Sequence, residues 1–203
     1  TFVATGTLLT LLCFTRGEAS TLGMDTEDLA TLRTQELAAA AAILGITHVT
    51  LLDYPDGGLG RVPLEDLAAR VEEVAMEADA FLVFDTGGIT GHPDHERATA
   101  AACEVAARRN LPVLAWALPL PVTTTLNEEF GEAFVGREEG ALDYRFDVDR
   151  SPQRAAIACH RSQSSDNPVL WHRLELMGDW ECLRSLPCHG SAFSHEGNVP
   201  NGR

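Results

Sequence analysis

Short apolar runs alternate with amphipathic stretches from residue 8 to about residue 118, and this pattern constrains the fold more than any other feature of the chain. Such alternation is typical of consecutive strand–helix units, whose right-handed crossovers make the strands parallel. The predicted strands lie at residues 8–14, 48–52, 80–84 and 113–117. The pattern therefore predicts an α/β protein with a mostly parallel sheet flanked by helices.

Capping residues and prolines mark the helices between these strands. The first helix is expected to begin at about Asp25, with Asp25 or Thr26 as its N-cap, and to stop at Gly45. The second is expected to begin at Pro63 and the third at Pro93, so that a helix separates each strand from the next.

After residue 120 the pattern is weaker. It predicts a strand at residues 144–148 and helices at residues 151–160 and 168–177. We expect residues 1–185 to form a single α/β domain and residues 186–203 to form a loose tail rich in Gly, Ser, Asn and Pro.

The composition excludes several classes of function. The chain has 203 residues and a formal net charge of −15, which repels phosphate backbones and anionic lipid, so we expect no nucleic-acid partner. The five cysteines are odd in number and none stands in a CxxC pair, so we expect unpaired thiols and a reducing, cytoplasmic location. No apolar run reaches the roughly 20 residues needed to span a bilayer, so no membrane insertion is expected.

Two histidines at the start of the third predicted helix have the spacing of a metal site. His92 and His95 are three residues apart, so both rings can face one point at the carboxyl edge of the sheet, with Asp94 between them. Neutral imidazole and carboxylate oxygen are the usual ligands of catalytic zinc, so this pattern favours a metal site over a merely solvated helix start. The three residues can hardly supply three ligands to one ion.

Other polar residues are expected near this edge, and each also has a structural explanation. The acids are Glu18, Asp53, Asp56 and Asp85, and His160 lies on a later helix. Acids of this kind also pair with a nearby Arg, form turns or cap loops. Arg33 can bind a substrate carboxylate, phosphate or hydroxyl with its guanidinium, or can pair with Glu36 or Glu27.

Taken together, five segments resemble the LmbE/PIG-L family of zinc-dependent de-N-acetylases. The segments are residues 15–20, Arg33 with Glu36 and Leu37, residues 55–57, residues 91–95 and residues 160–163. The resemblance implies a Rossmann-like fold and hydrolysis of the acetamide of an N-acetylglucosaminyl or similar N-acetyl amino-sugar conjugate, releasing acetate. A small-molecule conjugate is then the partner, and a homo-oligomer is left open. The alternative is a non-catalytic relative that binds sugars or another protein.

The resemblance also implies roles for particular residues. His95 corresponds to a ligand of zinc or another divalent metal, and His92 to the residue that stabilises the oxyanion or protonates the leaving amine. Asp94 would orient a histidine, Arg33 and Asp56 would bind substrate, and Glu18 would support the edge of the sheet.

One departure from the family is clear. Its first strand ends in His-Pro-Asp-Asp-Glu, which supplies two metal ligands and the general base, and no such segment is present here. We therefore expect two further ligands upstream of Thr1 and weak metal binding by the chain as written.

Overall fold

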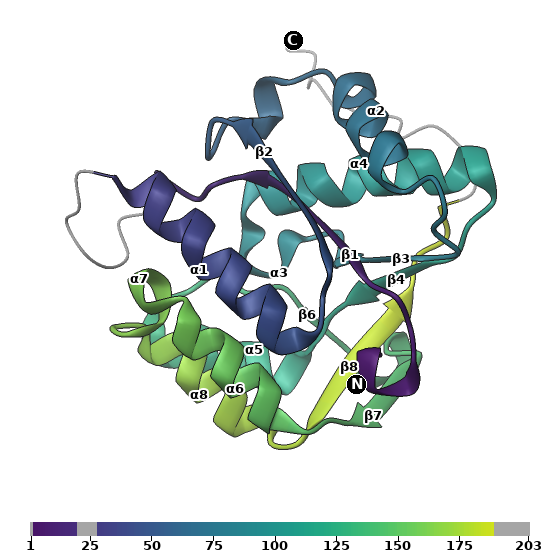
Figure 1. The fold of residues 1–203 in the computed structure, drawn as a ribbon. Helices are drawn as coiled ribbons and strands as arrows, with labels where there is room; N and C mark the ends of the chain where they lie inside the picture. Colours follow the sequence, from purple (N-terminus) through teal and green to yellow (C-terminus); the bar gives the residue numbers. More distant parts are fainter. Residues whose placement is uncertain (1, 20–27, 189–203) are drawn as a thin grey trace, which may run out of the picture.

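The computed structural model describes residues 2–19 and 28–188, and its strands form three separate sheets within that part of the chain (Figure 1). One sheet is the parallel pair of β1 and β2. The second has the order β3–β4–β8–β7, with β3 and β4 parallel and β8 antiparallel to both of its neighbours. The third is the short parallel pair of β5 and β6. The strand bounds are β1 (Thr10–Thr15), β2 (His48–Tyr54), β3 (Phe81–Phe84), β4 (Val113–Trp116), β5 (Leu118–Pro119), β6 (Gly136–Arg137), β7 (Tyr144–Asp147) and β8 (Trp180–Ser185).

The predicted α/β class is confirmed, and the predicted parallel sheet needs correction. The pairs β1–β2 and β3–β4 are parallel as expected from their helical crossovers. These two pairs do not join into one sheet, because β1 and β3 do not pair with each other in the described part of the chain. The later strands β7 and β8 add to β4 in antiparallel fashion, which gives a mixed sheet.

Eight α-helices occur in the described residues. They are α1 (Leu29–Leu44), α2 (Leu64–Val74), α3 (Gly88–Gly91), α4 (Pro93–Arg109), α5 (Leu120–Phe130), α6 (Arg150–Cys159), α7 (Arg161–Ser164) and α8 (Pro168–Met177), with 3-10 turns η1 (Val3–Thr5), η2 (Leu59–Arg61) and η3 (Glu139–Ala141). None of the described helices is long and apolar enough to cross a membrane.

The first long helix starts later than predicted. Its N-cap is Asp28, whose carboxylate accepts the Thr31 N–H at 3.0 Å, while Asp25 and Thr26 lie outside the described residues. The predicted stop at Gly45 is confirmed, because Gly45 adopts the left-handed conformation that ends a helix.

The apolar core links the two larger sheets. Phe14 from β1 packs with Leu67 and Val71 of α2 and with Ala101 and Val105 of α4, and the same cluster receives a side chain from β3. Helices α2 and α4 therefore lie on one side of the strands, while α1, α6 and α8 lie on the other (Figure 1). The burial of this cluster is what holds β1–β2 beside β3–β4.

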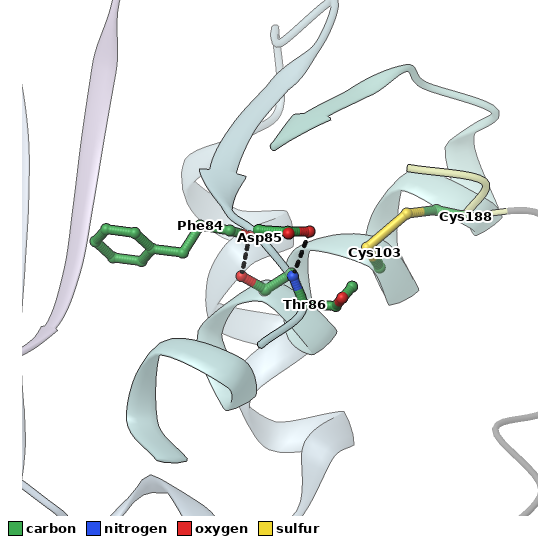
Figure 2. Close-up of a disulfide and its surroundings, with 6 residues drawn as sticks. Phe84, Asp85, Thr86, Cys103 and Cys188 are labelled. Atoms are coloured by element: carbon green, nitrogen blue, oxygen red, sulfur yellow. Dashed lines mark hydrogen bonds between the residues drawn. A yellow bond between two sulfur atoms is a disulfide. The ribbon is translucent and has the colours of Figure 1, made fainter. Parts of the chain in front are cut away.

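A disulfide corrects the expectation of unpaired thiols. Cys103 of α4 is bonded to Cys188, with 5.2 Å between their Cα atoms, while Cys13, Cys159 and Cys182 are free. Figure 2 shows the ring of Phe84 on the opposite side of β3 from this bond.

The disulfide bears on the predicted tail. Cys188 belongs to the segment that was expected to be loose from residue 186 onwards. Leu186 is only 7% exposed and packs beside Cys103. Residues 189–203 lie outside the described part of the chain.

Candidate active site

Two loops that follow parallel strands are bonded to each other through their acids. The Asp56 N–H donates to Glu18 Oε1 at 2.9 Å, and the Asp56 carboxylate accepts the Ala19 N–H at 3.1 Å. Thr15, at the end of β1, also donates its hydroxyl to Asp56 at 3.4 Å. The loops after β1 and β2 therefore form one polar surface at the carboxyl ends of these strands, where ligands of α/β proteins usually bind.

Glu18 is held as a carboxylate in this surface. Burial alone would raise its pKa, but hydrogen bonds from backbone N–H groups, including that of Asp56, together with the charge of Arg16, bring the pKa of Glu18 below its usual value. Arg16 itself pairs with Asp53 at 3.2 Å on the exposed side of the loop. Asp53 is thus explained as the partner of Arg16, and Glu18 and Asp56 remain as the two acids of the polar surface.

The third loop joins this surface through Asp94. This residue lies in the first turn of α4 and is 5% exposed. Its two carboxylate oxygens accept the Gly57 N–H at 2.8 Å and the Leu59 N–H at 3.1 Å, so the side chain connects the loop after β2 to α4. The negative charge also suits the positive end of the helix dipole. Its role of orienting a histidine stays a prediction, because both oxygens are engaged by the backbone.

The two histidines carry opposite hydrogen-bonding patterns. His92 is the N-cap of α4, and its Nδ1 accepts the Asp94 N–H at 3.2 Å, so the neutral ring carries its proton on Nε2. His95 Nδ1 lies 2.9 Å from the Gly88 carbonyl oxygen, which can only accept, so this ring carries its proton on Nδ1. The Nε2 of His92 is therefore a donor and the Nε2 of His95 a lone-pair ligand or base. The ring centroids are 5.0 Å apart.

Phe84, the last residue of β3, fixes the His95 ring from one side. The two rings are stacked with centroids 4.2 Å apart and planes inclined by 20°. Burial of His95 lowers its pKa below the usual value and outweighs the opposing effect of the Gly88 carbonyl. The ring is therefore neutral near neutral pH, which is the form that can offer the Nε2 lone pair.

The turn before the histidines is strained. Ile89 has a φ of 64° and a ψ of −55°, a conformation that β-branched residues rarely adopt, and its side chain is 2% exposed. Its carbonyl accepts the Val135 N–H at 2.8 Å. The neighbouring Gly88 has a φ of 65°, and a Cβ there would lie 3.2 Å from the Cβ of His95. The Ile89 side chain packs with Leu118 and Val122, so packing holds this strained turn directly before the histidines, as is common at functional sites.

Arg33 reaches the same surface from α1. It is 4% exposed, and a Cβ on Gly17 would lie 2.8 Å from its Nη1, so the guanidinium lies against the loop after β1. Burial lowers the pKa of Arg33, while the charges of Asp56, Glu36 and Glu18 favour its ionised form.

A buried serine anchors this arginine. The Arg33 Nε donates to the Ser162 hydroxyl at 3.3 Å, and Ser162 in turn donates its hydroxyl at 2.6 Å and its N–H at 2.8 Å to Glu36. Ser162 is fully buried. The alternative partner Glu27 lies outside the described residues, and Glu36 acts on Arg33 through the serine.

Of the other candidates, Asp85 has a structural role and His160 lies near Arg33. Asp85 is 1% exposed, pairs with Arg137, and accepts the Arg184 guanidinium at 2.8 Å, so it joins β3 to the strands after it. His160 ends α6, and burial lowers the pKa of its ring, with Glu36 and Arg33 as its charged neighbours. His160 thus lies near Glu36 and Arg33 and, among the described residues, has no hydrogen bond to Glu18 or Asp56.

The described residues do not complete a metal site. Within residues 2–19 and 28–188, no group of three His, Cys, Asp or Glu side chains is placed to hold a metal ion. In its neutral form His95 offers the Nε2 lone pair, while the carboxylates of Asp94 and Asp56 already accept hydrogen bonds from the loops. The donor set therefore does not fit zinc without further ligands.

Histidines, acids and a buried arginine thus lie at the carboxyl ends of parallel strands, where α/β proteins usually bind their ligands. The family model "GlcNAc-PI de-N-acetylase", PIG-L, matches residues 1–106, and the chain belongs to this family.

A curated relative from Kineococcus radiotolerans, a 1D-myo-inositol 2-acetamido-2-deoxy-alpha-D-glucopyranoside deacetylase, is 30% identical to this chain. The alignment covers 47% of this chain and 36% of that protein, so the chain spans little more than a third of this relative.

Solved structures of deacetylases share the fold. The N,N'-diacetylchitobiose deacetylase of Pyrococcus horikoshii is 20% identical, with a TM-score of 0.63 over 95% of this chain and 79% of its own. The zinc-inhibited form of the teicoplanin deacetylase Orf2 is 18% identical, with a TM-score of 0.63 over 91% of this chain and 89% of its own. Likeness at this level of identity supports the fold.

Proposed function

We propose that this chain contributes the hydrogen-bond donor and the substrate-binding residues of a de-N-acetylase that acts on an N-acetyl amino-sugar conjugate and releases acetate. The observation that carries the proposal is the histidine pair, whose two Nε2 atoms have opposite hydrogen-bonding capacity while their rings lie 5.0 Å apart. Membership of the PIG-L family supports the same reaction.

Each residue of the site has a task in this reaction. The Nε2–H of His92 would donate to the acetamide oxygen as negative charge develops there, or to the leaving amine. Arg33 would donate to the hydroxyls of the sugar, and Asp56 would accept from them, since their alignment is set by Ser162 and by the loop after β1. Glu18 would keep that loop and Asp56 in register.

Zinc is the metal that the family resemblance implies, and when bound it would polarise the acetamide and acidify a water molecule. We propose His95 as a ligand through Nε2, because its Nδ1–H is fixed by the Gly88 carbonyl in the manner of metal-binding histidines. The described residues hold no group of three metal ligands, and we propose that the remaining ligands come from outside residues 2–19 and 28–188.

The test compares the 203-residue chain with the protein that its gene encodes, using acetate release from N-acetylglucosaminyl-inositol and zinc content by elemental analysis. In the encoded protein, His95→Ala should lose zinc and turnover together. His92→Ala should keep zinc and lose about 10²- to 10³-fold in turnover, as other oxyanion donors do. Normal turnover in both variants would refute the proposal. Loss of zinc in His92→Ala alone would show that His92 is the metal ligand and His95 the donor.

A second function has its own support. The described residues hold no group of three metal ligands but retain the surface of Arg33, Asp56 and Glu18, which suits a sugar-binding module without catalysis. Calorimetric titration of the 203-residue chain with the same conjugate separates the two functions. Saturable binding by this chain, combined with no acetate release by the encoded protein, would favour the binding module.

A further inference from the structure

A cavity of about 350 Å³ lies on the face of the β3–β4–β8–β7 sheet that α4 does not cover. The strand register places the lining side chains of the sheet on one face, since Trp116 is paired with Leu183 on one side and with Phe84 on the other. The Phe84 ring lies on the opposite side of β3 from Cys103 of α4, so this face points away from α4 (Figure 2). The walls are mostly apolar, and the lining residues are Phe2, Leu82, Trp116, Phe146, Leu183, Gln153, Glu181 and Arg173. None of these residues belongs to the candidate active site.

Arg173 is the unusual member of this lining. It lies on α8, is only 8% exposed, and its guanidinium carbon lies 4.8 Å from the centroid of the Trp116 ring. Its Nη1 is buried and has no hydrogen-bond partner among the described residues. A buried guanidinium nitrogen without an acceptor is unfavourable, so the position calls for an acceptor from outside the described residues.

The neighbouring acid does not supply that acceptor, because Glu181 makes no hydrogen bond to the Arg173 Nη1 in the described part of the chain and each of its oxygens is bonded to another group. One oxygen of Glu181 is paired with Arg150, and the other accepts the Trp116 indole N–H at 2.8 Å. Arg150 is further bonded to Gln153 at 2.6 Å and to two carbonyls, so each of its three nitrogens donates a hydrogen bond. Because Arg150 behind the lining neutralises Glu181, the group of Arg150, Glu181 and Arg173 carries one net positive charge, in a chain that is strongly acidic overall.

We infer that this cavity binds a small monocarboxylate with an apolar body, whose carboxylate accepts hydrogen bonds from Arg173 and whose body lies against Phe2, Phe146 and Leu183. One cation matches one carboxylate, because a guanidinium fork pairs with the two oxygens of that group. The volume is at the lower end of the range of small-molecule sites, which run from roughly 300 to 1,000 Å³. Leu82, at 51% exposed, is where the lining meets solvent.

The experiment is a calorimetric titration of the purified 203-residue chain with 3-phenylpropionate and with octanoate, each compared with its neutral amide. The two acids share the recognised chemistry and tell an aromatic body from an aliphatic one. At least one acid should bind saturably with one site per chain, and its amide should bind about tenfold more weakly or worse, because the charge-assisted hydrogen bond is lost. No saturable binding of either acid up to 10 mM, or equal affinity for acid and amide, would overturn the inference.

Variants locate the site. Arg173→Met keeps the apolar stem and removes the cation, so affinity for the acid should fall at least about tenfold. The matched control is Arg145→Met, because Arg145 also lies over a tryptophan, 3.8 Å from the ring of Trp180, but is exposed and does not line the cavity. This control should bind the acid as the unchanged chain does. Equal losses in both variants would refute the assignment to Arg173.

A second variant covers the case in which Arg173→Met fails to fold, which circular dichroism would reveal. Leu82→Trp adds bulk at a lining residue that is already half exposed, so the fold should tolerate it while the volume for the ligand falls. Binding of the acid should be lost in this variant with its melting temperature retained. Retained binding in a folded Leu82→Trp variant would show that the acid binds elsewhere.

Discussion

The carboxylate of Asp94, at the start of α4, accepts the backbone N–H of Gly57 at 2.8 Å, although 37 residues separate the two in the chain. A second bond to the Leu59 N–H at 3.1 Å makes the connection bidentate. Asp94 therefore fixes the loop that carries Asp56 relative to the helix that carries His92 and His95. Asp94 shares this task with Arg97 of α4, whose guanidinium donates to the carbonyls of Leu59 and Val62.

Replacing Asp94 by Asn should destabilise the protein by about 1–3 kcal/mol, because one buried backbone N–H would lose its acceptor and the helix N-terminus would lose a negative charge. Urea unfolding monitored by circular dichroism measures this difference. Asp66→Asn is the matched control, since Asp66 also lies in the first turn of a helix but is exposed. A change of similar small size in both variants would contradict the role of Asp94 as a connection between the loop and the helix.

Asp85 should make stability dependent on pH in the acid range. Although burial opposes it, hydrogen bonds from Arg137 and Arg184 lower the pKa of Asp85 in the folded state. A lowered folded pKa stabilises the protein above the unfolded pKa, near 3.9, and this contribution is lost as the pH falls through the lower folded value.

The test of Asp85 is the free energy of unfolding at pH 7 and at steps below pH 4. Asp85→Asn should lower the free energy of unfolding by about 1–3 kcal/mol at pH 7, less than for a fully buried pair because both arginines reach solvent. The stability of this variant should also fall less steeply than that of the unchanged chain as the pH is lowered. Exposed Asp79→Asn should leave the profile unchanged. An acid profile for Asp85→Asn parallel to that of the unchanged chain would contradict the prediction.

The Cys103–Cys188 bond should reduce the number of thiols that react in the unreduced chain. Thiol titration of the denatured chain should give three groups without reductant, from Cys13, Cys159 and Cys182, and five after reduction. Since the bond closes a sequence separation of 85 residues, its reduction should lower the free energy of unfolding by about 2–4 kcal/mol. Cys188→Ser should reproduce this loss, whereas Cys159→Ser should not. Five reactive thiols in the unreduced chain would rule the bond out.

Ser162→Ala should weaken the position of Arg33. The change removes the acceptor of the Arg33 Nε and the donor to Glu36, so we expect a loss of about 1–3 kcal/mol in stability and weaker binding of the sugar conjugate. Exposed Ser165→Ala, three residues further on, should change neither. Calorimetric titration with the conjugate and urea unfolding provide the two measurements. Unchanged affinity and stability in Ser162→Ala would show that the serine does not hold the arginine.

Local signals explain which parts of the fold could be predicted. The helix α8 has its predicted bounds because Asn167 caps it and Pro168 suits its first position. In contrast, β8 went unpredicted, since its pairing with β4 and β7 depends on partners distant in the sequence. Strand periodicity also does not tell whether two parallel pairs belong to one sheet, so the division between β1 and β3 was missed.

The candidate site shows the same limit. The convergence of the loops followed from the strand–helix pattern, because parallel strands place their carboxyl ends together. Phe84 and Ser162 were not predicted as neighbours of His95 and Arg33, although Phe84 ends a predicted strand and Ser162 lies in the motif that begins at His160. The disulfide had no sequence signal, since its cysteines are far apart and have no characteristic spacing.

The separation of β1–β2 from β3–β4 affects how the protein can deform. A hydrogen-bonded ladder between neighbouring strands resists tilting, whereas apolar side chains in contact can slide by small amounts. The candidate site draws Asp56 from the loop after β2 and His95 from α4, which lies between β3 and β4 in the chain. Among the described residues, the apolar cluster and the bonds from Asp94 and Arg97 of α4 to the segment after β2 link the two pairs. The softest motion is therefore expected to be a rocking of one pair against the other, which would change the distance between Asp56 and His95 without breaking either sheet.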